Sequence, residues 1–477
     1  MDLGEGSSSS SDPGSAIQTI EIGHTILLRL PSGEIRTLKL EKKRCFRNIN
    51  LGKFGTFSSN ELVGQPYGLS YDIVDKKLKL APPKTIQEVE DTEATNELID
   101  DNQSVQPLTG EEIEAMKKSG ARASDIINIQ IEQHANYALK TEYSKEKYKK
   151  RKEAKYAKGF TTVLPTLFNV CEYWFKKDQT RLRDIRPDTL SQILNLASIR
   201  PGGRYLAVDD ASGIVVAGIL QRLGGTGRLI TVCDIESPPA YPCTMHMNFT
   251  KEYSSVMTTL NWATADEEYT PIVASSEPPT GTYKSEGQKN RLNKRKLATD
   301  VLMQNREELF AGEFDGLIVA SQYDAFSILE MLSPYLAGSA SIVVYSPHAQ
   351  ILADLQNKLR DLPQYLGPSL TEGWLRKYQV LPGRTHPTMN MSGSGGFILH
   401  TIKVYDDPSA SSVVSHRLKV KKARSEDASK SVTPDVTAQP EESTSVKDKE
   451  VVSSTPVQPQ VATASGTAPQ SSSTATT

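Results

Sequence analysis

Short apolar runs alternate with helix-like segments from Leu190 onward, and this alternation is the strongest structural signal in the chain. Runs typical of buried strands lie at residues 205–209, 229–234, 317–320 and 341–345. Residues 213–223 and 324–336 have the length and spacing of helices. Strand, helix and strand in repetition predict a parallel sheet with helices on both faces. We therefore expect the α/β class, with a Rossmann-like domain over residues 160–405.

A different pattern occupies residues 17–83. Ile26, Leu28 and Leu30 alternate, which is the two-residue period of a half-buried strand. The segment Pro31-Ser32-Gly33 supplies turn residues, and apolar residues resume from Ile35. We expect a small N-terminal β-rich domain here.

The segments between these regions lack a strand pattern. Residues 84–108 are acidic with almost no apolar periodicity, which predicts a linker. Thr109 and Glu112 have capping-box spacing and open a helical connector over residues 109–159. Residues 264–296 are polar and contain Pro and Gly, so we expect a long inserted loop in the Rossmann-like domain.

Composition adds limits to this outline. A chain of 477 residues exceeds the size at which one hydrophobic core stops growing, so several domains are expected. Residues 1–16 and 406–477 are rich in Ser, Thr, Pro and Ala, which predicts disorder at both ends. The four cysteines have no metal-ligand spacing, and no apolar run reaches membrane-spanning length. We expect a soluble protein of a reducing compartment, without a metal, a disulfide framework or a membrane partner.

The turn after the first strand of the Rossmann-like domain is where S-adenosylmethionine would lie in a methyltransferase. Such a turn is rich in glycine because a Cβ would push the cofactor away. An acidic residue followed by Gly-x-Gly-x-Gly would place glycines at Asp209 and Ala211, and only Gly213 is in place. We expect Asp209 and Asp210 to be solvated residues at a strand end. Asp234 or Glu236 could accept the hydrogen bonds of a ribose, or be ordinary polar residues.

The end of the fourth strand also lacks a residue that could act as a general base. It ends at Ala320 and Ser321, where a general base would be needed, and Asp315 begins the strand at its opposite end. The seven histidines form no pair at metal-ligand spacing, and no nucleophile elbow or phosphate loop is present. We expect His386 to stabilise a turn. The sequence thus predicts no catalytic, cofactor-binding or metal-binding residue in this chain.

Local basic clusters are the remaining candidates for function, since the formal net charge is only −2. Clustered Lys and Arg bind phosphates through counterion release. Three groups are expected to contact RNA: Lys147, Tyr148, Lys149, Lys150, Arg151, Lys152, Lys155 and Tyr156; then Lys176, Lys177, Arg181 and Arg183; and then Lys289, Arg291, Lys294, Arg295 and Lys296. Each group could instead be a solvated face, and the third a nuclear-localisation-like run.

Several long strings resemble one family, the non-catalytic subunit of the eukaryotic tRNA (adenine-N1)-methyltransferase. The strings are residues 141–152 (TEYSKEKYKKRK), 186–190 (RPDTL), 315–321 (DGLIVAS), 374–382 (WLRKYQVLP), 384–387 (RTHP) and 392–396 (SGSGG). The resemblance implies a nuclear heterotetramer of two catalytic and two non-catalytic subunits that acts on the T-loop adenosine of tRNA. It also implies that the catalytic partner binds S-adenosylmethionine, while this chain binds tRNA and supports assembly. Two alternatives stay open: an active S-adenosylmethionine-dependent RNA methyltransferase, and a stand-alone RNA-binding or translation-associated scaffold.

Overall fold

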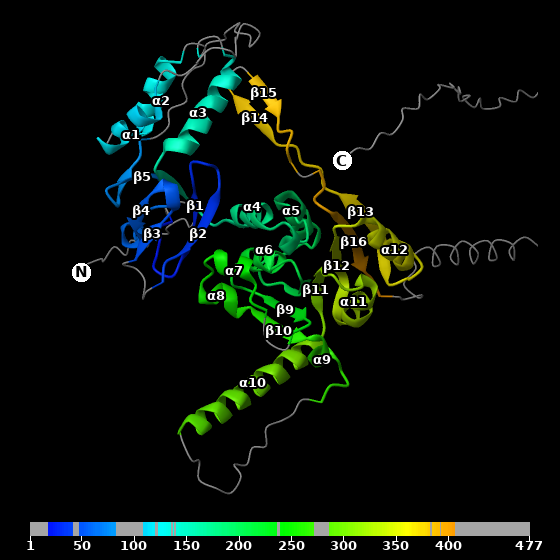
Figure 1. Cartoon of the computed structure of the whole chain (residues 1–477). Coiled ribbons are helices and arrows are strands. Elements are labelled where there is room, and N and C mark those ends of the chain that lie inside the picture. Colours follow the sequence, from blue (N-terminus) through cyan, green and yellow to red (C-terminus); the bar gives the residue numbers. More distant parts are fainter. Residues whose placement is uncertain are drawn as a thin grey trace, which may run out of the picture. The chain divides into compact units, whose positions relative to one another are not determined.

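The computed structural model describes residues 18–41, 47–82, 108–119, 123–134, 137, 140–235, 239–270, 286–381, 384–391 and 393–405. The described chain contains an N-terminal antiparallel sheet, a group of helices and a larger mixed sheet (Figure 1). The two predicted disordered ends and most of the acidic linker lie outside the described residues.

The N-terminal sheet has the order β2-β1-β7-β5-β6, and every pair in it is antiparallel. Its strands are β1 (Thr25–Arg29), β2 (Ile35–Lys39), β5 (Ser70–Val74), β6 (Lys77–Leu80) and β7 (Gly159–Val163). A small pair, β3 (Asn48–Asn50) with β4 (Thr56–Ser58), and the 3-10 helices η2 (Gly52–Phe54) and η3 (Ser59–Leu62) lie beside it in sequence. The alternating Ile26 and Leu28 are buried, as expected for strand residues that face a core.

Strand β7 corrects the predicted boundary at residue 160. Leu27 pairs with Val163 and Tyr71 pairs with Phe160, so β7 joins β1 to β5 inside the N-terminal sheet. The first residues assigned to the Rossmann-like domain therefore belong to the β-rich domain. Both partners of β7 are distant in the chain, since Leu27 precedes Val163 by 136 residues and Tyr71 precedes Phe160 by 89 residues. Such pairing leaves no local pattern in the sequence, which explains the error.

Three helices occupy the segment between β6 and β7. They are α1 (Gly110–Lys118), α2 (Ala123–Glu132) and α3 (Glu142–Tyr156). Ile113, Ile126, Ile127 and Tyr156 form their common core. The hydroxyl of Thr141 accepts a hydrogen bond from Ser144 N and caps the start of α3.

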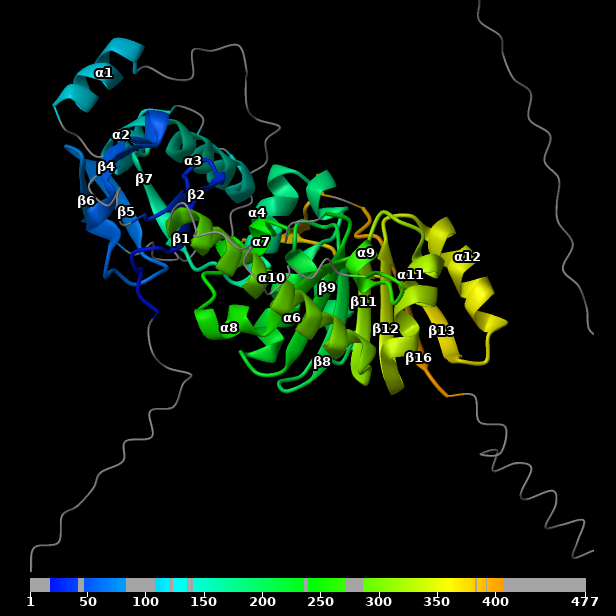
Figure 2. The same cartoon turned by 90° about the horizontal axis from the view of Figure 1, so that it is seen from below.

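The larger sheet has the order β10-β9-β8-β11-β12-β16-β13. Figure 2 labels all of these strands except β10. Its strands are β8 (Arg204–Asp209), β9 (Arg228–Cys233), β10 (Met257–Asn261), β11 (Phe314–Ala320), β12 (Leu336–Ser346), β13 (Tyr365–Glu372) and β16 (Phe397–Lys403). The first five strands in this order are parallel, and β16 is antiparallel to both of its neighbours. The predicted α/β class with a Rossmann-like sheet is confirmed.

Helices cover both faces of this sheet. One core includes residues of α4 (Leu167–Lys177), α5 (Pro187–Leu196), α6 (Ile214–Leu223) and α7 (Pro242–His246). The core of the other face includes residues of α9 (Trp262–Ala265), α10 (Glu286–Phe310), α11 (Ala325–Leu332) and α12 (Ala349–Arg360). The remaining elements are α8 (Lys251–Ser255), η5 (Thr180–Leu182), η6 (Ser333–Tyr335) and the hairpin of β14 (Tyr378–Leu381) with β15 (Arg384–Pro387).

Helix α10 corrects the predicted loop over residues 264–296. Residues 286–296 form its first turns, and residues 264–265 end α9. The first half of α10 is polar on almost every side, so it lacks the apolar stripe by which a helix is recognised in sequence. Residues 271–285 lie outside the described part of the chain.

Strand β1 also contacts the α/β domain. Thr25 N donates to Asn248 Oδ1 at 2.7 Å, and Asn248 Nδ2 donates to Thr25 O at 2.9 Å. The side chain of Leu27 belongs to the same buried cluster as the helices of that domain.

Among the described helices, none has the length and apolar character needed to cross a bilayer.

Candidate functional site

The turn between β8 and α6 is held by a buried carboxylate. Asp209 is 6% exposed. Its Oδ1 accepts from Ala211 N at 2.7 Å, and its Oδ2 accepts from Val216 N at 2.9 Å. A negative charge is favourable there because the first amides of a helix have no partner within the helix. Burial nevertheless raises the pKa of Asp209 to about 6.

These contacts correct two expectations about Asp209. The residue is not solvated, and it does not occupy a glycine position. Its carboxylate ties the turn to the helix, so Asp209 is the acidic residue that precedes the turn. The three glycine positions then fall on Ala211, Gly213 and Val215, and only Gly213 keeps a glycine.

Tyr241 covers the glycine that remains. Gly213 has φ +77°, and a Cβ added to it would lie 2.5 Å from Tyr241 Cβ. The tyrosine ring is therefore packed on the backbone that a methyltransferase leaves open for its cofactor. Ala211 and Val215 are fully buried beside it. These residues do not fit S-adenosylmethionine against the turn.

Polar contacts join the ends of three neighbouring strands near this turn. Ser321 Oγ donates to Asp210 Oδ2 at 2.7 Å, and Gln322 N donates to the same oxygen at 3.0 Å. Tyr323 Oη donates to Asp234 Oδ2 at 2.8 Å, which links the segment after β11 to the segment after β9. Asp234, a candidate for ribose binding, is thus engaged by a tyrosine. Glu236 lies outside the described residues.

Sequence reasoning missed the position of Asp210. Its N donates to Ala320 O at 3.0 Å, which brings a carboxylate to the end of the fourth strand, where we expected none. Two donors bind one oxygen of that carboxylate, so it ties strands together. Asp315 lies at the opposite end of β11, as expected, where it accepts from Arg204 N at 2.8 Å.

The residues of the first basic cluster lie on two different sides of helix α3. Lys147, Lys150, Arg151 and Lys155 are exposed and spaced by three and four residues, and we call them the basic face of α3. Lys150 has one acidic neighbour, Glu146, at 3.3 Å on the surface. A surface pair of this kind contributes little, so Lys150 stays available to phosphates. The exposed Lys155 lies at the edge of this face, with its ammonium 5.3 Å from the centre of the Tyr156 ring.

The other side of α3 is packed. Tyr156 is 7% exposed and lies in the core of the three helices, which disfavours the predicted contact with RNA. The ring of Tyr148 lies 5.1 Å from the ring of His134. The ammonium of Lys152 lies 5.0 Å from the centre of the Tyr148 ring, and burial lowers its pKa. Lys149, on the same side, is half-buried.

The second cluster makes several contacts with neighbouring side chains. Lys176 pairs with Glu172 at 3.2 Å, and Arg181 pairs with Asp178 at 3.2 Å. Lys177 Nζ donates to Tyr173 Oη at 3.0 Å. Arg183 is half-buried in a left-handed turn, with φ +51°. Lys176, Lys177 and Arg181 nevertheless stay exposed and only Arg183 is half-buried, so this cluster offers three cations to phosphates against four on the basic face of α3.

The third cluster lies on the first half of α10, where Lys289, Arg291, Lys294 and Arg295 are exposed and Lys296 is half-exposed. No ion pair engages these side chains within the described part of the chain.

His386 lies on strand β15 opposite Gln379 and not in a turn, which corrects the expected role of this residue. No group of three metal ligands is found among the residues that the structure describes.

The sequence is similar to that of several known proteins. The sequence model of the Gcd10p family matches residues 19–299. A tRNA (adenine(58)-N(1))-methyltransferase non-catalytic subunit TRM6 from Debaryomyces hansenii is 30% identical over 80% of this chain and 85% of its own length. The subunit of the same name from Mus musculus is 27% identical, over 74% and 82% of the two chains.

The chain is also similar to two solved structures. A tRNA (m1A58) methyltransferase TrmI from Aquifex aeolicus is 12% identical over 81% of this chain and 100% of its own, with a TM-score of 0.42. An S-adenosylmethionine-dependent O-methyltransferase from Thermotoga maritima is 13% identical over 83% and 98%, with a TM-score of 0.46.

Proposed function

This chain belongs to the Gcd10p family, and we propose that it is the non-catalytic, tRNA-binding subunit of a tRNA (adenine-N1)-methyltransferase. The relatives that carry this name match it over most of their length. The observation that carries the proposal is the combination of a covered cofactor turn with an exposed basic helix. Tyr241 and the side chain of Ala211 occupy the turn, whereas the basic face of α3 presents four cations to solvent.

The proposal divides the work between two kinds of subunit. A catalytic partner holds S-adenosylmethionine and transfers the methyl group to the T-loop adenosine, and no cofactor binds in this chain. Two copies of each subunit form a heterotetramer, and the complex acts in the nucleus. A basic segment of the C-terminal tail, residues 417–424, is suited to nuclear import, and it lies outside the described residues.

Binding of tRNA is proposed to begin with its phosphates. The basic face of α3 releases counterions when it meets a polyanion, and this favours binding without reading sequence. Folded RNA suits such recognition because its deep major groove is poorly accessible to side chains. Lys149, Lys152 and Tyr148 support the helix from its packed side, and the exposed cations of α10 and Lys176, Lys177, Arg181 and Arg183 are secondary contacts.

The experiment is methyl transfer from radiolabelled S-adenosylmethionine to tRNA. It compares this chain alone, a purified catalytic partner alone, and the two together. Activity confined to the mixture, together with tRNA binding by this chain, supports the proposal. Activity of this chain alone would show that it is an active methyltransferase. Binding of tRNA without any effect on the partner would favour a stand-alone RNA-binding scaffold.

A further inference from the structure

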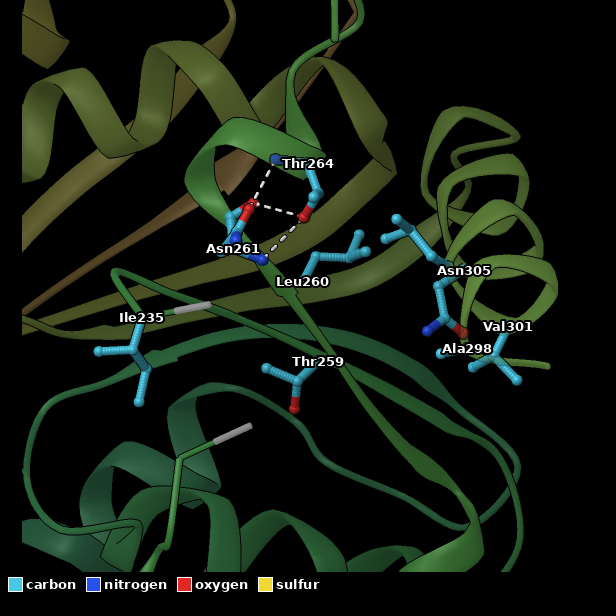
Figure 3. A pocket seen from close by; sticks show the side chains of 9 residues that line it. Ile235, Thr259, Leu260, Asn261, Thr264, Ala298, Val301 and Asn305 are labelled. Carbon is cyan, nitrogen blue, oxygen red and sulfur yellow. Dashed lines mark hydrogen bonds between the residues drawn. The ribbon is translucent and has the colours of Figure 1, made fainter. Parts of the chain in front are cut away.

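A pocket of about 320 Å³ lies between the end of β10, the start of α9 and the middle of α10 (Figure 3). Its lining residues are Ile235, Thr259, Leu260, Asn261, Thr264, Ala298, Val301, Leu302 and Asn305. Aliphatic side chains therefore form much of the wall, with amide and hydroxyl groups between them. The volume falls within the range of about 300–1,000 Å³ that is usual for small-molecule sites.

One buried amide gives the pocket a specific polar group. Asn305 is 5% exposed, and its Oδ1 accepts from Arg228 Nη2 at 3.3 Å. Its Nδ2 has no hydrogen-bond partner among the described residues, and the amide end faces the strand side of the pocket in Figure 3. The Nδ2 atom is not one of the fully buried side-chain atoms that lack a partner, so it is open to the pocket, where an acceptor is placed to receive its hydrogen bond.

The opposite wall is stiff. Asn261 Oδ1 accepts from Thr264 N at 2.7 Å, and Thr264 Oγ1 accepts from Asn261 N at 2.9 Å. This reciprocal capping box fixes the start of α9 where it lines the pocket. A preformed wall reduces the ordering cost of binding.

The face of α10 that lines the pocket carries basic side chains nearer the start of the helix. Ala298, Val301 and Asn305 recur every three to four residues on one face of α10. The same face, followed toward the start of the helix, reaches Lys294 and then Arg291, ~6 Å and ~10 Å beyond Ala298 at 1.5 Å per residue. Both side chains are exposed. Lys289 and Lys296 project from the opposite face of the helix.

We propose that this pocket receives one unstacked nucleobase of the bound tRNA, while Lys294 and Arg291 bind the phosphates beside it. The inference rests on the proposed tRNA-binding function and adds a site to it. Bases in RNA loops and ends are splayed out and held by apolar contacts and by hydrogen bonds to their edges. A base carries both the flat apolar surface that the aliphatic wall accommodates and acceptor atoms that can receive a hydrogen bond from Asn305 Nδ2. The adjacent cations fit the polyanionic backbone.

The first test measures tRNA affinity of the full-length chain in complex with its catalytic partner. Ala298→Phe fills the pocket from an exposed helix position, and Gln304→Phe places the same ring on α10 outside the lining. We expect Ala298→Phe to weaken binding about 5- to 10-fold, the scale of one lost base contact. Gln304→Phe should stay within about 2-fold of the unchanged complex, because it touches no part of the proposed site.

A second pair of variants separates the two faces of α10. Arg291→Glu with Lys294→Glu reverses the charges beside the pocket, and Lys289→Glu with Lys296→Glu reverses two charges on the opposite face. The net change is equal, so a purely long-range effect would be equal too. We expect the first pair to lose at least about three times more affinity than the second. Equal losses would overturn the placement of the phosphates.

A third measurement identifies what enters the pocket. A photoreactive benzophenone side chain at position 301 should crosslink to a nucleobase of tRNA, read by nuclease digestion and mass spectrometry, whereas one at position 296 should not. Unchanged tRNA affinity of Ala298→Phe, with binding still lost when the basic face of α3 is reversed, would overturn this inference and leave the proposed function standing. Absence of tRNA binding by the unchanged complex would instead contradict the proposed function.

The last measurement tests whether free nucleotides bind in the pocket. Adenosine monophosphate and S-adenosylmethionine are titrated separately into the unchanged complex and into Ala298→Phe. Weak binding that competes with tRNA supports a base site. Tight binding of either compound that leaves tRNA affinity unchanged would mean that the pocket serves a free nucleotide, which would overturn the inference.

Discussion

Charged side chains on helix α3 and in the turn after β8 meet opposite surroundings. On α3, Lys147, Lys150 and Arg151 project into solvent. In the turn, the carboxylate of Asp209 is buried and accepts two backbone hydrogen bonds. The charges of α3 are free to meet an external polyanion, whereas the charge of Asp209 is used to hold the protein's own backbone.

The difference shows that burial decides what a charged residue does in this protein. Helix α3 keeps its cations exposed because Tyr156 anchors the opposite side in an apolar core. The turn after β8 keeps the outline of a cofactor site, but Tyr241 and Ala211 pack into it. An exposed basic face and a closed turn thus result from where apolar side chains lie beside the charges.

Reversing the basic face of α3 should have the largest effect. Lys147, Lys150, Arg151 and Lys155 are changed together to Glu. Loss of several phosphate contacts should lower tRNA affinity on the order of 1,000-fold at low salt and reduce the salt slope by about 3. Folding should be unaffected, because all four side chains are exposed. An unchanged salt slope would remove α3 from the interface.

The anchor beneath that face is tested by Tyr156→Ala. Removing a buried aromatic ring usually costs about 3 kcal/mol of stability. We expect faster hydrogen exchange across α1, α2 and α3, with tRNA affinity lowered through loss of the helix. Tyr156→Phe keeps the ring and removes the hydroxyl that accepts from the buried Gln130 Nε2 at 3.5 Å, so it should cost only about 1 kcal/mol and leave most of the exchange protection in place. Equal exchange in both variants would contradict the packing role.

Much of the fold could be read from the sequence because its signals are local. Strands such as β8 and β9 are compact apolar runs, and the two-residue period of Ile26 and Leu28 marks β1. Strand β7 was not assigned to the N-terminal sheet because its partner strands are distant in the sequence. The first half of α10 was not predicted as a helix because it has no apolar stripe.

The candidate site was harder to predict than the fold. The departure from glycine at Ala211 was visible in the sequence, but Tyr241 lies far along the chain and belongs to no motif. The basic run 147–152 was visible as well. Its division into an exposed and a packed side depends on where Tyr148 and Tyr156 find neighbours, and this is a property of the tertiary structure.

The buried charge of the turn is tested through pH. Because the pKa of Asp209 is raised to about 6 in the folded protein, from an unfolded value near ~3.9, the folded state binds more protons between these values. Stability should therefore fall as pH rises from about 4 to about 6, by on the order of 2–3 kcal/mol. Asp209→Asn should remove this part of the slope in urea unfolding measured at each pH, while tRNA affinity at neutral pH stays unchanged. A slope equal to that of the unchanged protein would show that the burial of Asp209 has no such effect.

The smallest expected effect is the sharpest test of the comparison, because it divides four consecutive cations. Lys150→Gln with Arg151→Gln removes two charges from the exposed side of α3, and Lys149→Gln with Lys152→Gln removes two from the packed side. Net charge changes equally, so only the position on the helix differs. We expect the exposed pair to lower tRNA affinity about 10-fold and the packed pair by less than about 3-fold, because Lys152 lies over the Tyr148 ring and Lys149 is half-buried. If both pairs lower the affinity equally, the run 147–152 acts as a diffuse positive charge, and the face that the helix presents has no part in binding.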